Sequence, residues 1–313
     1  MLATLPLLLL LQNAAPPQGA AAPVAAPAAA TVTYVPNRVF DTAAAKFIDF
    51  ESMVADLANA DVVFVGEQHD DANTHRLELA ILEGLLRRHR RPVVSLEMFE
   101  RDVQPVLDRF LGGQSTEAEM LKAARPWPAY ATAYRGLVDI ARAQGLTVVA
   151  ANVPRSIASS VAKTGREALA TLSQADRAFV ARDLECPLDG YFDRFTATMS
   201  GHPAGTQTPE QQRAMTERYY WAQCVKDETM GESIAQTLAK GAADVSGSKA
   251  GPLVHYNGAF HSDFGLGTAE RTMRRVPGKR SIVVSMLPVS DLDALTPSAE
   301  DLKRAQFLVY TVK

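Results

Sequence analysis

The segments VVFVGEQH (residues 62–69) and LVHYNGAFH (residues 253–261) share a pattern, in which a short apolar run of strand type leads into Gly-x-x-His. A glycine at the end of a buried strand lets the chain turn sharply. In a parallel sheet the carboxyl ends of the strands meet at one edge, where ligands usually bind. The repeat therefore predicts that His69 and His261, far apart in the sequence, share one pocket.

Strand-like and helix-like segments alternate along the rest of the chain, which predicts an α/β fold with a mainly parallel sheet and helices on both faces. Amphipathic helices are expected at His75–Arg88 and Tyr130–Ala143. Continuous apolar runs are typical of strands buried on both faces. They lie at Val62–Val65, Val93–Leu96, Thr147–Ala151, Leu253–Asn257, Ser281–Met286 and Phe307–Val312.

No strand pattern occurs between Pro154 and Gly251, where the sequence indicates several helices. The longest begins with Pro209 in its first turn and runs to about Lys240. We therefore expect a helical insertion over about residues 154–250. Long insertions between strands commonly carry function, so we expect this one to fold over the edge of the sheet as a lid or subdomain.

The first thirty residues differ in composition from the rest, with an apolar run at Leu5–Leu11 followed by an Ala/Pro-rich stretch to Ala30. This pattern predicts a signal peptide and linker over residues 1–30, an α/β domain over residues 31–313 and export to the periplasm. No lysine or arginine precedes the apolar run. A disordered tail on a cytosolic protein is therefore the alternative.

The 32 basic and 35 acidic residues are dispersed and give a formal charge of −3, which argues against nucleic acid as a main partner. Only two cysteines occur, Cys186 and Cys224, 38 residues apart. An oxidising compartment would permit one disulfide between them. Two buried free thiols are equally compatible with the sequence.

Polar residues follow each of the central strands. Two histidines and two glutamates that converge at one edge of a sheet can bind a divalent metal ion or carry out acid–base chemistry. A carboxylate that follows a buried strand also needs a partner such as a histidine, an arginine or a metal. The candidate residues are Glu67, His69, Glu97, Asn152, Arg155 and His261.

Several of these residues have simpler structural alternatives. Glu67 could cap the helix that follows it, and Asn152 could hydrogen-bond the turn before Pro154. Arg155 could pair with Glu97. His75 is expected to be an exposed residue in the first turn of a helix, and His255 to be a core histidine within a strand.

Four motifs carry a resemblance to a known family: VVFVGEQHD (62–70), SLEM (95–98), VVAANVPR (148–155) and GAFH (258–261). Over roughly residues 38–290 the chain resembles the ChaN-like haem-binding proteins. Their wider group includes the Tiki proteases, TraB proteins and erythromycin esterases. The resemblance implies haem or iron uptake and a site at Glu67, His69, Glu97 and His261, with Asn152 and Arg155 as supporting residues.

Haem binding requires an apolar slot, an axial ligand and cations for the two propionates. Tyr130 and Tyr134 are four residues apart on one helical face and are the candidate ligands outside the motifs, with Arg135 as a propionate partner and Trp127 for stacking. A core-facing aromatic stripe is the alternative. A homodimer that shares haem, and outer-membrane haem-uptake components, are the expected partners.

A hydrolase, either an esterase or a peptidase, is the rival hypothesis. In it His69 and His261 would hold a divalent metal ion or act as base, Glu67 would activate water and Glu97 would orient a histidine. The sequence contains no GxSxG and no HExxH motif, so neither a standard serine hydrolase nor a zincin is indicated. The sequence leaves open whether the protein is an enzyme.

Overall fold

The computed structural model of the protein describes residues 34–88, 90–199, 208–241 and 249–313, and the predicted signal peptide and linker at residues 1–30 lie outside them. The strands are β1 (Asn37–Asp41), β2 (Lys46–Ile48), β3 (Val62–Glu67), β4 (Arg90–Glu100), β5 (Val148–Asn152), β6 (Lys249–Gly258), β7 (Ser281–Val289) and β8 (Phe307–Val312). The α-helices are α1 (Phe50–Leu57), α2 (Ala72–Arg87), α3 (Gln104–Leu111), α4 (Glu117–Ala124), α5 (Arg135–Gln144), α6 (Arg155–Thr164), α7 (Gln174–Arg177), α8 (Gly190–Met199), α9 (Pro209–Lys240) and α10 (Gly267–Arg275).

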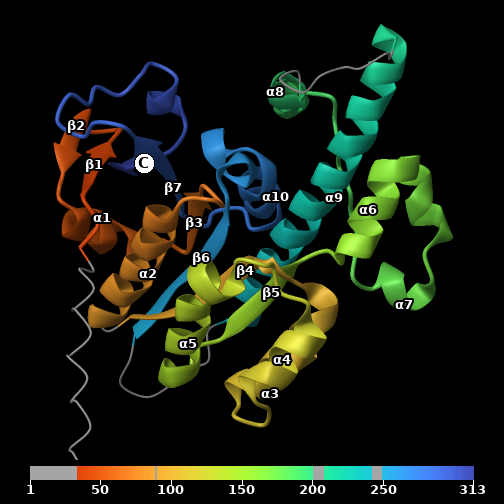
Figure 1. Cartoon of the computed structure of the whole chain (residues 1–313), viewed down its shortest axis with the longest axis horizontal. Coiled ribbons are helices and arrows are strands. Elements are labelled where there is room, and N and C mark those ends of the chain that lie inside the picture. Colours follow the sequence, from red (N-terminus) through yellow and green to blue (C-terminus); the bar gives the residue numbers. More distant parts are fainter. Residues whose placement is uncertain (1–33, 89, 200–207, 242–248) are drawn as a thin grey trace, which may run out of the picture. The chain divides into compact units, whose positions relative to one another are not determined.

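The strands form one sheet in the order β2-β1-β8-β7-β3-β6-β4-β5. All neighbours from β8 to β5 are parallel, whereas β1 pairs antiparallel with β2 and with β8. The predicted α/β fold with a mainly parallel sheet is therefore confirmed (Figure 1). The two strands that lead into the Gly-x-x-His motifs, β3 and β6, are direct neighbours at the centre of the sheet.

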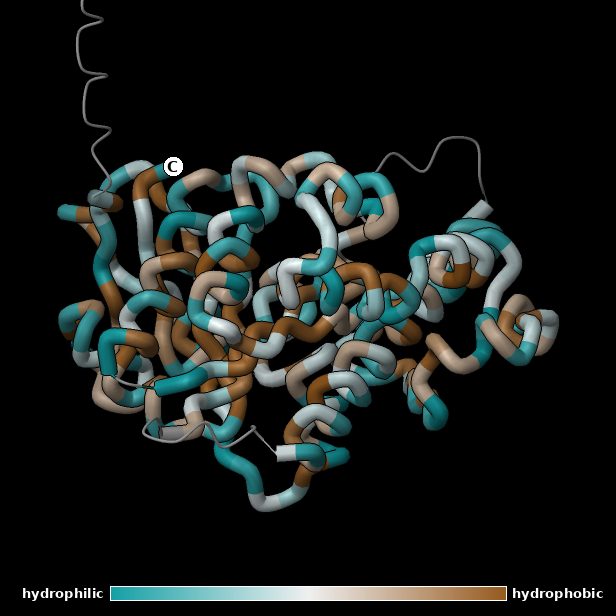
Figure 2. The backbone as a smooth tube through the Cα atoms, turned by 90° about the horizontal axis from the view of Figure 1, so that it is seen from below, coloured by the Kyte–Doolittle hydropathy of each residue, from teal (hydrophilic) through white to brown (hydrophobic). Residues whose placement is uncertain are grey.

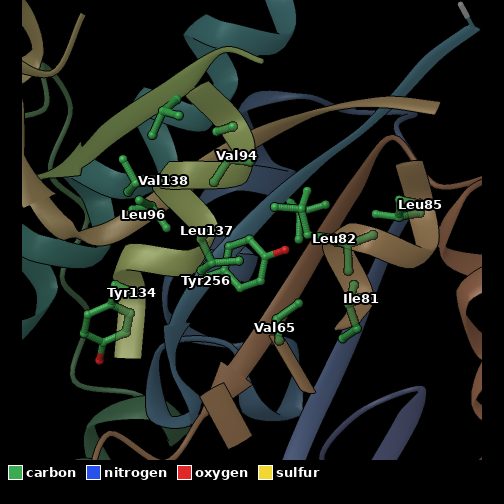
Figure 3. Packing of buried hydrophobic residues seen from close by; sticks show 14 of the residues in the cluster. Val65, Ile81, Leu82, Leu85, Val94, Leu96, Tyr134, Leu137, Val138 and Tyr256 are labelled. Carbon is green, nitrogen blue, oxygen red and sulfur yellow. The ribbon is translucent and has the colours of Figure 1, made fainter. Parts of the chain in front are cut away.

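Alternation along β3 divides its side chains between two apolar layers, because successive strand residues point to opposite faces. Val63 and Val65 pack with α1, α2 and α5, and Tyr256 lies in the same layer among residues of α2 and α5 (Figure 3). Val62 and Phe64 pack on the other face against α9 and α10. Hydrophobic segments accordingly run through the middle of the described structure (Figure 2). Helices on both faces explain why the central strands are continuously apolar.

The predicted helical insertion is present and consists of α6 to α9. Helices α6 and α7 lie beyond the β4–β5 side of the sheet, whereas the C-terminal part of α9 packs on one face of the sheet (Figure 1). Helix α9 begins at a capping box, in which Thr208 and Gln211 bond each other's backbone amides. Its buried stripe follows the three-to-four-residue spacing of one helical face and contains Tyr220, Cys224, Asp227, Gly231 and Ile234. Within the described residues, no helix has the length and apolar character needed to span a membrane.

The helix expected over Tyr130–Ala143 differs in its first part. Tyr130–Tyr134 forms a π-helical turn, η2, and the regular helix α5 starts only at Arg135. A π-helical turn offsets side chains from the spacing of an α-helix. Tyr130 and Tyr134 therefore do not project as an i, i+4 pair of one α-helix.

The two cysteines form a disulfide between Cys186, which precedes α8, and Cys224 in α9. This resolves the choice that the sequence left open. The bond ties the segment leading into α8 to the helix on which the insertion packs.

Replacing both cysteines with serine should lower the free energy of unfolding by about 2–4 kcal/mol, because a cross-link across this separation restricts the unfolded chain. Urea unfolding of the oxidised wild type and the double variant measures the difference. Dithiothreitol should destabilise the wild type and leave the variant unchanged. Equal unfolding midpoints for the oxidised wild type and the double variant would contradict the prediction.

Candidate functional site

The carboxyl ends of β3, β6 and β4 form the framework of the site, with β6 between the other two strands. In the β3–β6 register Glu67 lies opposite Gly258, so the two motifs leave the sheet side by side. Glu97 reaches across from β4, and its Oε2 accepts a hydrogen bond of 2.8 Å from the amide of Gly258. The parallel arrangement therefore brings Glu67, His69, Glu97 and His261 to one edge of the sheet.

Gly66 and Gly258 allow the two motifs to pack against each other, because neither has a side chain at the point of contact. A Cβ atom on Gly258 would lie 2.6 Å from Nε2 of His69, and one on Gly66 would lie 3.0 Å from the Cα atom of Ala259. Both distances are shorter than ordinary van der Waals contact. The glycine of each tetrapeptide is thus required by the residues of its partner, which gives the repeat a physical reason.

Glu67 holds His69 at the edge of the sheet. Its Oε1 accepts hydrogen bonds from Nδ1 of His69 and, at 2.8 Å, from the hydroxyl of Tyr134. Burial opposes ionisation of Glu67, but the bonds from the histidines outweigh it and lower its pKa to about 2. Burial likewise opposes charge on His69, and the bond to Glu67 with the charge of Glu97 raises its pKa overall. The His69 side chain is 47% exposed, whereas the Glu67 side chain is fully buried.

His261 lies between two buried carboxylates. Its Nδ1 donates to Asp227 of α9 at 2.6 Å, and its Nε2 lies 3.2 Å from Oε1 of Glu97. Asp227 also accepts hydrogen bonds of 2.8 Å from Tyr191 and Thr268. Burial alone would lower the pKa of His261, but the charges of Glu97 and Asp227 raise it to about 10. The ring is therefore held as a cation in a defined orientation.

His75 is buried, so the expectation of an exposed histidine at the start of a helix is wrong. Its Nδ1 lies 3.0 Å from Glu78 and 3.1 Å from Oε2 of Glu67. Burial again opposes the charge, and the proximity of the two glutamate carboxylates raises the pKa of His75 to about 10. Burial and the charge of Glu67 raise the pKa of Glu78 well above its usual value. Helix α2 itself is capped by Asp71, whose side chain accepts a hydrogen bond of 2.6 Å from the amide of Thr74.

A pocket of about 550 Å³ opens beside His69 and His261. Its apolar wall comes from Tyr191 of α8, from Phe260 and from Phe264, which precedes α10. Its cations are Arg194 and Arg304. The guanidinium of Arg194 lies 3.3 Å from the centre of the Phe264 ring, and Arg304 pairs with Asp263 at 2.6 Å. Helix α8 of the insertion thus supplies part of the pocket wall.

The tyrosines proposed as ligands do not line this pocket. Tyr130 is buried in the core, 6.0 Å from Phe99 between ring centres, and its hydroxyl has no hydrogen-bond partner in the described part of the chain. The Tyr134 hydroxyl points away from the apolar cluster that its ring borders (Figure 3) and donates a hydrogen bond to Glu67. Arg135 pairs with Glu117 at 2.6 Å. Trp127 contacts the edge of the His69 ring, with centres 5.0 Å apart.

Arg155 and Asn152, the expected supporting residues, do not contact the Glu97 carboxylate. Arg155 pairs with Glu100 at 2.5 Å rather than with Glu97, because Glu97 already has His261 and the Gly258 amide as partners. Asn152 donates to the backbone carbonyl of Glu97 and accepts from the amide of Val153, so it holds the turn before Pro154. His255 is a buried core histidine, as predicted, and pairs with Ser95 at 2.9 Å.

Sequence reasoning missed Asp227 and Glu78 and placed His75 at the surface, although helical spacing contained a signal for all three. His75 and Glu78 continue the apolar stripe that Leu82 and Leu85 form on α2, and Asp227 interrupts the buried stripe of α9. A titratable residue on a core-facing stripe must find a partner, because an isolated buried charge is costly. That rule identifies all three without knowledge of the fold.

Comparison with known proteins identifies one family. Residues 53–272 match the family model described as "Haem-binding uptake, Tiki superfamily, ChaN". A solved structure of ChaN from Campylobacter jejuni, described as showing cofacial haem binding, is 18% identical with a TM-score of 0.65, and the match covers 88% of this chain and 97% of that chain. The erythromycin esterase EreC is 13% identical with a TM-score of 0.43, over 85% of this chain and 80% of that chain. No curated protein matches the sequence.

Gly258→Ala should displace His69 with little loss of stability, because the half-exposed ring can rotate away from the new Cβ. The displaced ring loses its bond to Glu67, so its pKa measured by NMR should fall. Gly66→Ala meets backbone instead and should cost about 1–3 kcal/mol of unfolding free energy. Gly190→Ala is the control, since a Cβ there meets nothing within 4 Å. An unchanged His69 pKa in Gly258→Ala would refute the close approach.

The contribution of His261 to stability should decline as pH rises. Below about 6.5, the ordinary histidine pKa, the ring is charged in both states and paired only in the folded one. As pH increases to about 10, the unfolded chain loses a proton that the folded protein retains, and the stabilisation disappears. The difference in unfolding free energy between wild type and His261→Gln should therefore shrink across this interval. His255→Gln is the control, because burial lowers the pKa of His255 to about 4 and its difference should stay constant there.

Proposed function

The chain belongs to the ChaN family of haem-binding uptake proteins, and we propose that it binds haem in the pocket beside His69, with Nε2 of His69 as the iron ligand. The observation that carries the proposal is the Glu67–His69 pair. Glu67 accepts the hydrogen bond from Nδ1–H, so Nε2 of this half-exposed ring is the nitrogen that binds iron once it has lost its proton. A carboxylate behind a ligating histidine also raises the basicity of the ligand.

The remaining residues of the pocket fit haem in shape and charge. Its volume of about 550 Å³ lies within the range of small-molecule sites. Tyr191, Phe260 and Phe264 offer aromatic surface for a porphyrin. Arg194 and Arg304 line the pocket with side chains that are 38% and 28% exposed, and they could exchange their carboxylate partners Glu300 and Asp263 for propionates. Tyr130, Tyr134 and Arg135 are the alternative residues. To take part, Tyr134 and Arg135 would have to leave Glu67 and Glu117, and Tyr130 would have to leave the core.

Haemin titration tests the ligand. The full chain should give a shifted, saturable Soret band that His69→Ala loses, whereas Tyr130→Phe and Tyr134→Phe retain it. Binding should weaken on acidification, because a proton on Nε2 competes with iron. Arg194→Gln should weaken binding about tenfold or less, since it removes one partly exposed ion pair with a propionate.

His255→Gln is the matched control, because it changes a histidine outside the pocket. Loss of the band in Tyr134→Phe with retention in His69→Ala would transfer the ligand role to the tyrosine. A spectrum no different from that with an unrelated protein would overturn the haem proposal.

Export and partners complete the proposal. The N-terminal sequence supports secretion to the periplasm, where the protein would receive haem from outer-membrane uptake components. Two copies with open pockets could bind their haems face to face as a homodimer, in line with the cofacial binding described for ChaN. Light scattering with and without haemin, together with the haem-to-protein ratio, measures whether dimerisation depends on the ligand.

A hydrolase is the second candidate, favoured by the two carboxylate–histidine pairs at one pocket, Glu67–His69 and Asp227–His261. Glu67 can orient His69 as a general base, the cationic His261 can stabilise negative charge, and a bound divalent ion could activate water there. Esterase and peptidase substrates should then be turned over by the wild type and not by His69→Ala, with His255→Gln again as control. Turnover without a haem spectrum would favour this function.

A further inference from the structure

We propose that Glu67, His75 and Glu78 form a closed binding site for a divalent first-row transition metal ion, behind the pocket and separate from haem. Among the residues that the structure describes, these three supply ligand atoms that all lie within 4.8 Å of one another. The set joins the end of β3 to the first two turns of α2. It differs from the four-residue metal set expected from the sequence.

The orientation of His75 favours a ligand role. Its Nε2 lies 3.1 Å from the backbone carbonyl of His69. A carbonyl only accepts hydrogen bonds, so Nε2 carries a proton and the second nitrogen, Nδ1, faces the two carboxylates. Metal-binding histidines commonly donate their other ring nitrogen to a carbonyl in this way. A metal ion would take the place of the Nδ1 proton, which points toward the carboxylates of Glu67 and Glu78.

Each of the two carboxylates has an oxygen that finds no hydrogen-bond partner among residues 34–88, 90–199, 208–241 and 249–313. Oε1 of Glu67 is occupied by His69 and Tyr134. Its Oε2 lies 3.1 Å from Nδ1 of His75, but the hydrogen bond of that nitrogen goes to Glu78, so Oε2 accepts none from the described residues. Oε1 of Glu78 is likewise without a partner. Glu67 is 2% exposed and Glu78 is fully buried. Two buried carboxylates with unpaired oxygens are costly, and a dication offsets both the charge and the lost bonds.

The distances suit a first-row ion. Ligand atoms about 2.1 Å from an ion lie about 3.0 Å apart at the right angle of octahedral coordination and about 3.4 Å apart at the angle of a tetrahedral zinc site. The contacts of Nδ1 with the two carboxylates are 3.0 and 3.1 Å. One imidazole and two carboxylates suit Zn²⁺ or Mn²⁺, whereas Ca²⁺ requires six to eight oxygen ligands. The burial of all three residues is typical of a structural site.

The ion would act as a clip between β3 and α2. By binding Oε2 of Glu67 it would orient Oε1 toward His69, so it would be a positioning ion for the pocket. Its first consequence is stability, because an ion that binds only the folded protein raises the melting temperature.

The test uses the full chain without a histidine tag, dialysed against EDTA and without haem. Calorimetric titration with Zn²⁺ and with Mn²⁺ should show one tight site per chain for at least one of them, with a higher melting temperature. Glu78→Gln preserves shape and should weaken binding by at least tenfold and abolish the thermal shift. Glu83→Gln, an exposed glutamate on the same helix, is the matched control. His75→Gln is the second variant if Glu78→Gln does not fold.

No binding by the folded wild type would overturn the proposal and leave a cluster that shares protons only. Equal binding by wild type and both cluster variants would place the ion elsewhere and overturn it as well. Neither readout involves haem, so this inference and the haem proposal can fail independently.

Discussion

The buried carboxylate of Glu67 is the constraint on which the site depends. Its chain position, directly after the apolar residues of β3, removes it from water, so each oxygen needs a partner within the protein. Oε1 faces the edge of the sheet and holds His69 with Tyr134. Oε2 faces α2 and meets His75 and Glu78. One side chain thus connects the pocket to the helix behind it.

A second constraint is steric and links the two halves of the chain. His69 occupies space that a side chain on residue 258 would fill, and Ala259 approaches Gly66 in the same way. Neither motif can be packed in this manner without the glycine of the other. The β3–β6 pairing, the orientation of His69 and the repeated tetrapeptide are therefore one geometric solution.

The helical insertion contributes residues of α8 and α9 to the site itself. Asp227 on α9 orients His261 and accepts from Tyr191 of α8, whose ring forms part of the pocket wall. The Cys186–Cys224 disulfide attaches the segment before α8 to the same helix. Close packing of α9 on α10 at Gly231, where a Cβ would lie 3.0 Å from the Thr272 amide nitrogen, supports that arrangement.

The sequence by itself determined the class of fold, the central strands and the meeting of both motifs at one edge, because apolar periodicity and strand-ending glycines are local properties of the chain. It also identified His255 as a core residue by alternation. Only the tertiary structure decided that β6 lies between β3 and β4. It also decided that Arg155 pairs with Glu100 and that the Tyr134 hydroxyl donates a hydrogen bond to Glu67. It likewise placed His75 and Asp227 against their partners. Such pairings join residues distant in sequence, and a buried charge is compatible with many partners until the packing of strands and helices leaves one within hydrogen-bonding distance.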